Sequence, residues 1–192
     1  MEPRLEQAQA GRRTVLFVDA AHFVFGSFLG YLWCVMRRWV RGASGRQRLN
    51  VLGTLNAVTH QLTTVCNDTY INAETVCDLL RLLRRQYCGQ PLTLFLDNAR
   101  YQRCQLVQEL AKELNIELQY LPSYSPNLNL IERFWKLVKK KCLYSKHYPD
   151  YASFREAVLN CIRHAHRKHK TELQSLLTLN FQSFEEALFV AV

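Results

Sequence analysis

The sequence predicts an α/β protein: a mixed five-stranded sheet with helices on both faces. Two observations lead to this class. Apolar runs such as residues 14–19 and 91–97 lack polar alternation, which is typical of strands buried on both faces. Other segments, such as 73–88, carry apolar residues at helical spacing. Hairpin-joined strands early in the chain, and strands alternating with helices later, indicate a mixed sheet.

The first part of the chain supplies three of the expected strands. A polar tail, residues 1–13, precedes them. A glycine turn at Gly26 and a basic loop over 37–48 separate them, and Gly53 is interpreted as a candidate β-bulge. The expected strands are 14–19, 28–36 and 48–59.

The rest of the chain alternates helices and strands. Gly89 is expected to end the first helix. Beyond about residue 150 we expect a C-terminal helical extension that reaches residue 192. At 192 residues, the chain is expected to form a single domain around a sizeable core. The expected helices are 73–88, 102–114, 128–143 and 151–169, and the remaining strands are 91–97 and 116–121.

Charge and cysteine usage restrict the class of protein. The net charge of +9 and the pI of about 9.4 favour a polyanionic partner, nucleic acid first, although a basic surface without a partner is the alternative. The seven cysteines are scattered and form no C-x-x-C pair, which indicates reduced thiols rather than zinc ligands or disulfides. Residues 20–36 are apolar, but they are too short and too rich in glycine for a membrane span. We therefore expect no membrane requirement.

Three acidic residues stand out by position. Asp19 and Asp97 each close an apolar strand, and Glu132 lies at the start of the helix expected over 128–143. Thirty-four residues separate Asp97 from Glu132. An acid at the end of a buried strand is costly unless it has a partner or a function. Taken singly, each has an ordinary explanation, as a turn former, a helix cap or a first-turn helix acid.

Together the three acids predict a site for divalent cations. If Asp19 and Asp97 end neighbouring strands, two charges about 4 Å apart repel by about 4 kcal/mol at an effective dielectric of 20. Mg²⁺ takes carboxylate oxygens and retains water and phosphate as its other ligands. Two such ions about 3.5–4 Å apart support phosphoryl transfer.

Basic residues near the third acid suggest phosphate contacts. Glu132 lies at the border of the apolar face of its helix, and lysines follow it at i+4 and i+7 spacing. A solvated face without a ligand is the alternative interpretation. The residues expected to contact phosphates are Arg133, Lys136, Lys139 and Lys140 on this helix, with Arg46 and Arg48 in the basic loop.

Two long runs resemble a known family. LFLDNARYQRC (94–104) and LPSYSPNLNLIERFWKLVKK (121–140) resemble the catalytic domain of bacterial insertion-sequence transposases of the mariner superfamily. These are aspartate-aspartate-glutamate enzymes on a ribonuclease H-like fold. VLFVDA (15–20) looks like their first acidic strand and ASGRQRLNVLGTLNAVT (43–59) like their third-strand region. The resemblance spans about 14–145.

The resemblance implies a function for the acids. Asp19, Asp97 and Glu132 would be the catalytic and metal-binding residues, using Mg²⁺ or Mn²⁺ with two ions per site. Such an enzyme cuts DNA at transposon ends with water, and the freed 3′-hydroxyl then attacks target DNA, typically at a TA dinucleotide. Tyr124, in the loop before the last acid, would pack against the protein or contact DNA.

The resemblance also implies partners. Relatives usually carry a helix-turn-helix region before the catalytic domain, whereas about thirteen polar residues precede the first strand here. We therefore expect a helix-turn-helix partner from a separate reading frame, with a fragment or a decayed copy as the alternatives. The family implies a dimer on DNA, in the bacterial cytoplasm at the nucleoid. Two other functions stay open: a metal nuclease of the same fold that cuts without joining, and an inactive DNA-binding remnant.

Overall fold

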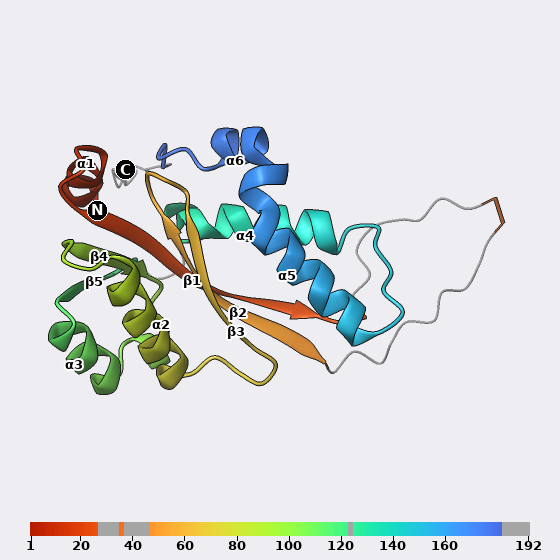
Figure 1. The fold of residues 1–192 in the computed structure, drawn as a ribbon, viewed down its shortest axis with the longest axis horizontal. Coiled ribbons are helices and arrows are strands. Elements are labelled where there is room, and N and C mark those ends of the chain that lie inside the picture. Colours follow the sequence, from red (N-terminus) through yellow and green to blue (C-terminus); the bar gives the residue numbers. More distant parts are fainter. Residues whose placement is uncertain (27–34, 37–46, 123–124, 182–192) are drawn as a thin grey trace, which may run out of the picture.

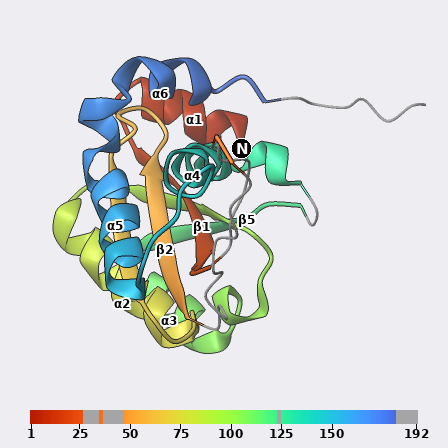
Figure 2. The ribbon, with the colours of Figure 1, turned by 90° about the vertical axis from the view of Figure 1, so that its right-hand side faces the viewer.

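A computed structural model describes residues 1–26, 35–36, 47–122 and 125–181. A five-stranded sheet in the order β3-β2-β1-β4-β5 lies between helices on both faces (Figures 1 and 2). β1 pairs antiparallel with β2 and parallel with β4, so the sheet is mixed, and the predicted α/β class is confirmed. The strands are β1 (Thr14–Val24), β2 (Arg48–Asn56), β3 (Leu62–Asn67), β4 (Leu92–Leu96) and β5 (Ile116–Tyr120).

The five strands are not quite the five that were expected. The strand predicted over 28–36 falls on residues that the structure does not describe, apart from a bend at Val35 and Met36. β3 was not predicted, because its residues are half-buried and half of them are polar, so they show no continuous apolar run. β1 continues past its predicted end, because its last residues pair with the beginning of β2.

The helices agree with expectation except at the two ends of the chain. The C-terminal extension, expected to be helical up to residue 192, is helical as far as Leu176, residues 177–181 are not helical, and 182–192 lie outside the described residues. The segment 1–13, expected as a polar tail, contains α1, and Leu5 and Ala8 of this helix are buried. The side chain of Asn72 caps α2 and that of Asp150 caps α5, each by accepting a backbone N–H bond in the first turn. The helices are α1 (Glu2–Gln9), α2 (Ala73–Gln86), α3 (Gln105–Glu113), α4 (Leu130–Cys142), α5 (Tyr151–Lys168) and α6 (Lys170–Leu176), with short 3-10 helices at Arg100–Gln102 and Pro126–Leu128.

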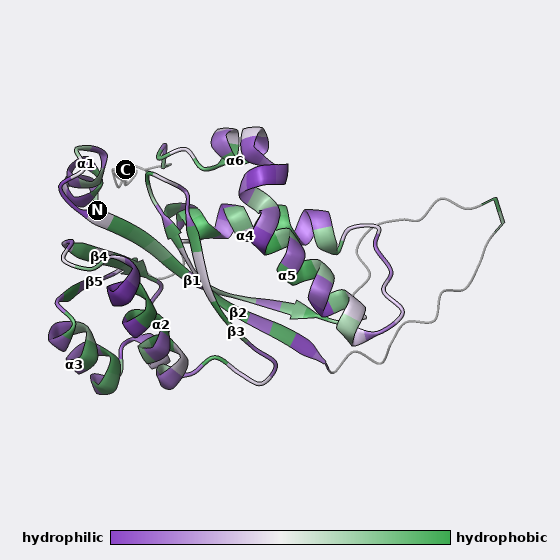
Figure 3. Ribbon diagram, viewed as in Figure 1, coloured by the Kyte–Doolittle hydropathy of each residue, from purple (hydrophilic) through white to green (hydrophobic). Residues whose placement is uncertain are grey.

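Each face of the sheet has its own core. One core joins β1 and β2 to α1, α4, α5 and α6, and the other joins the sheet to α2 and α3. Figure 3 shows hydrophobic residues along β1 and both colours on α4 and α5, as expected for a buried strand and amphipathic helices. Of the helices that the structure describes, none is both long enough and apolar enough to cross a membrane.

Candidate active site

The strand register places Asp19 beside Asp97. β1 and β4 run parallel with Phe17 opposite Phe95, and the two rings stack with centroids 5.4 Å apart. Each acid lies two residues beyond its phenylalanine, on the same side of the sheet. Neighbouring strands lie about 4.8 Å apart. Both carboxylates therefore face the layer that contains α4.

Glu132 reaches this edge because the start of α4 is tied to β1. The Asn129 side-chain Nδ2 donates a hydrogen bond of 3.1 Å to the Val18 carbonyl, and Asn129 is almost completely buried. The Asn129 carbonyl in turn accepts the backbone N–H of Glu132 at 3.1 Å. The first turn of α4 is therefore fixed one residue from Asp19. Sequence reasoning missed Asn129, although asparagine just before a helix is a recognised signal.

Gly53 allows α4 to lie close to the sheet. It pairs with Asp19 across β1 and β2. A Cβ at this position would lie 2.6 Å from Cζ2 of Trp135 and 3.2 Å from Cδ1 of Ile131. The pairing of β2 runs regularly through Gly53 to Thr64 on its other side, so the interpretation as a β-bulge is wrong. The glycine is required for close helix packing instead.

The three acids influence one another electrostatically. Burial, followed by the charges of Glu132 and Asp97, raises the pKa of Asp19 to about 7. Burial also raises the pKa of Asp97. The pKa of Glu132 is raised by burial and by the charge of Asp97, against the opposing effect of Lys136. Each of the three pairs is therefore close enough to interact, and none of the acids takes part in an ion pair of the described residues.

Two further side chains line the same place, and sequence reasoning assigned neither to the site. Burial and the charges of Asp97 and Asp19 raise the pKa of Tyr101 to about 12, so its hydroxyl stays protonated near neutral pH. Gln102 is fully buried beside the Asp97 carboxyl, and its backbone carbonyl accepts the Tyr120 hydroxyl at 3.1 Å. Both follow Asp97 within the DNARYQ run, which was the available signal.

The acids fit a hard divalent cation by their chemistry. Within the described parts of the chain, no three histidine, cysteine or acidic side chains form a ready-made metal cage. Three carboxylates that raise one another's pKa are nevertheless a site whose repulsion a cation would relieve. An all-oxygen set of this kind suits Mg²⁺ or Mn²⁺. We expect the carboxylates to move closer together when the ion binds.

The structure leaves some of the expected DNA contacts exposed. Arg46 and Tyr124 lie outside the described residues. Arg48 is exposed at the start of β2, and its Nε and Nη2 donate to the Thr69 carbonyl at 3.3 and 3.1 Å. Three lysines of α4 form no ion pair among the described residues. Lys136 and Lys140 are exposed, and Lys139 is half-buried.

Arg133 is already engaged within the protein. Its Nη1 donates to the carbonyls of Leu176 at 3.4 Å and Thr178 at 2.8 Å, and its Nη2 donates to that of Asn180 at 3.1 Å. The guanidinium also lies 5.5 Å from the ring centroid of Phe181. Its contact with DNA stays a prediction, and the contacts observed here point to an internal role.

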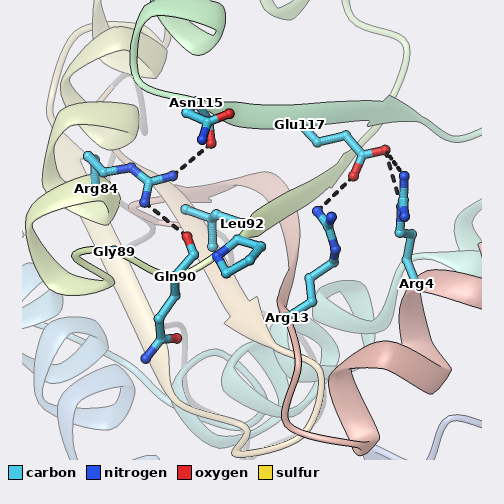
Figure 4. A pocket seen from close by; sticks show the side chains of 9 residues that line it. Arg4, Arg13, Arg84, Gly89, Gln90, Leu92, Asn115 and Glu117 are labelled. Carbon is cyan, nitrogen blue, oxygen red and sulfur yellow. Dashed lines mark hydrogen bonds and ion pairs between the residues drawn. The ribbon is translucent and has the colours of Figure 1, made fainter.

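A cavity of about 450 Å³ lies at the other end of β4, away from the acids (Figure 4). It is lined by three arginines and by Glu117 of β5, which accepts from Arg4 at 2.8 Å and from Arg13 at 2.9 Å. None of the three acids lines it, so it is not the candidate active site.

Comparison with known proteins agrees with this geometry. The sequence matches the family described as DDE superfamily endonuclease over residues 14–155. No curated protein matches it by sequence. Among solved structures, the Mos1 transposase paired-end complex with left transposon end matches with a TM-score of 0.64 and 15% identity, over 93% of this chain and 56% of that chain.

Two further structures give the same result. The catalytic domain of Mos1 mariner transposase matches with a TM-score of 0.60 and 13% identity, over 92% of this chain and 81% of that chain. The Mos1 transposase catalytic domain with Raltegravir and Mg matches with a TM-score of 0.58 and 14% identity, over 96% of this chain and 92% of that chain. At these identities the likeness shows the fold, and it confirms the ribonuclease H-like prediction. The match over residues 14–155 shows more: this chain belongs to the DDE superfamily of endonucleases.

Proposed function

We propose that this chain is the catalytic domain of a DNA transposase that cuts transposon ends and joins them to target DNA. One observation carries the proposal: Asp19 and Asp97 extend from adjacent parallel strands toward Glu132, and each of the three interacts with the other two. Asp19, Asp97 and Glu132 are the proposed catalytic and metal-binding residues. The family assignment supports a nuclease, and the reaction on transposon ends extends it.

The roles of the side chains follow from their surroundings. Asp19 and Asp97 would hold Mg²⁺ or Mn²⁺ from the sheet and Glu132 from α4, with two ions per site. When bound, the ions would activate the attacking hydroxyl and stabilise the leaving oxygen of the phosphodiester. Tyr101 keeps its proton near neutral pH and can donate a hydrogen bond beside Asp97. The side chain of the buried Gln102 interacts with the Asp97 carboxyl and favours its charged form.

DNA is the proposed substrate and partner. Lys136 and Lys140 are exposed on the helix that carries Glu132. Lys136 also interacts with the Glu132 carboxylate, so a phosphate backbone lying across the acids would meet it first and would reach Lys140 one turn further along the helix. The net charge of +9 favours the same polyanion. Structures of Mos1 include a paired-end complex with its left transposon end and a strand transfer complex.

The wider assembly is proposed on the resemblance. The chain spans 56% of the Mos1 chain in the paired-end complex. We propose a dimer on DNA, end recognition by a helix-turn-helix partner from a separate reading frame, and insertion at TA dinucleotides. The bacterial nucleoid is the proposed place of action. The domain proposed to do this is the whole chain, whose helical extension from about residue 150 consists of α5 and α6 in the described residues; residues 182–192 lie outside them.

A strand-transfer assay tests the proposal. The protein would be incubated with Mg²⁺ or Mn²⁺, a TA-containing plasmid, and pre-cut duplexes that carry the DNA flanking its reading frame. Joining of the duplex 3′-ends to the plasmid supports a transposase. Cutting without joining indicates a metal nuclease of the same fold. Neither reaction, together with a melting temperature unaffected by either cation, would indicate an inactive remnant.

A further inference from the structure

The end of the described chain crosses the start of α4, immediately beside Glu132. We name residues 176–181 the C-terminal strap. Arg133 donates three hydrogen bonds to carbonyls of the strap, of 2.8, 3.1 and 3.4 Å, and stacks over its last aromatic ring, Phe181. A single guanidinium therefore holds the strap at four points, one residue away from a proposed metal ligand.

The strap also reaches the strands that carry the other two acids. The Phe181 ring lies 5.8 Å from Phe17, which stacks at 5.4 Å on Phe95. Phe17 precedes Asp19 by two residues, and Phe95 precedes Asp97 by two. Phe17 and Phe95 are almost fully buried, so this aromatic row is a packed part of the core beside the two carboxylates, on the same face of the sheet.

The strap begins from a fixed point. α6, which leads into it, packs against α4 (Figure 2), and Lys141 pairs with Glu172 at 2.9 Å. Leu173 and Leu177 are buried in the core on this face of the sheet. This attachment lies at the far end of α4 from Glu132. The strap is thus fastened at both ends, by α6 at its start and by Arg133 and the aromatic row at its finish.

We propose that the C-terminal strap positions the acid cluster for metal binding, with Arg133 as the positioning residue. This inference rests on the proposed metal-dependent function. It also gives Arg133 a role inside the protein in place of the phosphate contact that its sequence position suggested.

The physical reason is the need to hold like charges together. Without a cation, repulsion pushes Glu132 away from Asp19 and Asp97. The first turn of a helix frays easily, because its N–H groups lack intrahelical partners. Asn129 holds this turn from the sheet side and Arg133 holds it from the strap side. Loss of either attachment would leave the turn free to move, which weakens the cation site without removing a ligand.

Metal binding measured on the full chain tests the proposal. The probe is Mn²⁺ alone, with its affinity read by calorimetry or by the paramagnetic resonance of the free ion. Arg133→Ala should bind Mn²⁺ about 10–100-fold more weakly, as is usual when a group supporting a ligand is lost. The Mn²⁺ affinity of Arg133→Lys should lie between those of the wild type and Arg133→Ala, because an ammonium group cannot bond to several carbonyls at once as a guanidinium does. Phe181→Leu keeps the apolar contact and should cause a smaller loss.

Arg155→Ala is the matched control. It removes an arginine and its ion pair with Asp68 at 3.3 Å, and it leaves both attachments of the strap in place. This variant should bind Mn²⁺ like the wild type even if its melting temperature falls. If Arg133→Ala does not fold, Arg133→Lys and Phe181→Leu provide the same comparison.

The outcomes separate the two proposals. The proposal that the strap positions the acids would be overturned by wild-type Mn²⁺ affinity in Arg133→Ala and Arg133→Lys, or by an equal loss of affinity in Arg155→Ala. Either result would leave the metal-dependent function intact. A wild-type chain that binds no Mn²⁺ would overturn both. Weakened binding in the Arg133 variants alone supports the strap.

Discussion

The acidic groups at the two ends of β4 lie in opposite electrostatic surroundings. At its start, the Glu117 carboxylate accepts hydrogen bonds from Arg4, Arg13 and Thr93, and these partners, against some burial, lower its pKa (Figure 4). At its finish, Asp97 lies beside other carboxylates, and Asp19 there has a pKa raised to about 7. The negative charge at the start of β4 is compensated by arginines of the protein, whereas the charges of the acids at its other end form no ion pair among the described residues.

The difference separates structure from proposed function. The Glu117 network ties α1 to β4 and β5, so its charges stabilise the fold. The cluster of Asp19, Asp97 and Glu132 destabilises the cation-free fold, since its like charges lie close together and two of them, Asp19 and Glu132, are half-buried. A protein retains such a cluster when a ligand supplies the missing charge, and the predictions below test whether a divalent cation does so here.

The largest expected effect follows from removing a charge at the uncompensated end. Asp97→Asn should reduce Mg²⁺-dependent DNA cleavage by at least about 10²–10³-fold. Its melting temperature without metal should stay the same or rise, because repulsion is relieved. Plasmid nicking and thermal unfolding measure the two effects. Glu117→Gln is the control, with reduced stability and retained cleavage per folded molecule. Cleavage at the wild-type rate in Asp97→Asn would remove this residue from the site.

The next effect concerns the close packing that brings α4 to the acids. Gly53→Ala places a Cβ 2.6 Å from Trp135, within a packed core, so α4 must shift. The free energy of unfolding should fall by about 1–3 kcal/mol. The stabilisation by Mn²⁺ should fall as well, since Glu132 moves with the helix. Denaturant unfolding with and without Mn²⁺ measures both.

A compensating change checks the cause. Trp135→Leu removes the ring atoms that meet the new Cβ. The double variant should therefore lose less stability than the sum of the two single variants. Simple additivity would show that the clash is not the reason for the loss.

Sequence reasoning was strong where one residue type has few explanations. Buried apolar runs ending in an acid predicted both β1 and β4, and the register confirms that they are neighbours. The order of the sheet, with β1 between β2 and β4, follows from pairing over long sequence distances and was not predicted strand by strand. β3 was missed because its polar residues gain their strand geometry from pairing with β2.

The site shows the same division. Asp19, Asp97 and Glu132 stand out by position, so they could be proposed from the sequence. Tertiary packing decides the supporting residues: Gly53 acts through the approach of Trp135, and Arg133 acts through carbonyls more than forty positions away. An arginine beside lysines on an amphipathic helix predicts a phosphate contact equally well. Only the fold reveals the alternative partners.

The free energy of unfolding should change with pH in opposite directions for the acids at the two ends of β4, because the pKa of Asp19 is raised and that of Glu117 is lowered. Asp19 has a raised pKa, so the folded state binds more protons, and the stability of the cation-free protein should fall as pH rises from about 4 to about 7. Asp19→Asn should remove this fall and be more stable than the wild type at pH 7.5, by at most about 4 kcal/mol. Urea unfolding across this pH range, with a chelator present, measures it.

Glu117 should behave in the opposite way. Its pKa is lowered from the ordinary value of 4.5, so its contribution is complete at neutral pH and is lost as pH falls below that value. Glu117→Gln should cost about 1–2 kcal/mol at pH 7 and little at pH 3. If Asp19→Asn and Glu117→Gln change the pH dependence of the unfolding free energy in the same direction, the contrast between the two regions is refuted.

The smallest expected effect concerns cations rather than acids. Lys136 and Lys140 are exposed on α4 and form no ion pair among the described residues, whereas Arg4 pairs with Glu117. If each lysine neutralises one phosphate, Lys136→Ala with Lys140→Ala should reduce the slope of log affinity against log salt by about 1.8 for duplex DNA. Arg4→Ala should leave the slope unchanged. Fluorescence anisotropy with a labelled duplex at several salt concentrations measures both. An equal change in both variants would mean that DNA responds to net charge and not to this face, because the paired arginine and the free lysines would then act alike.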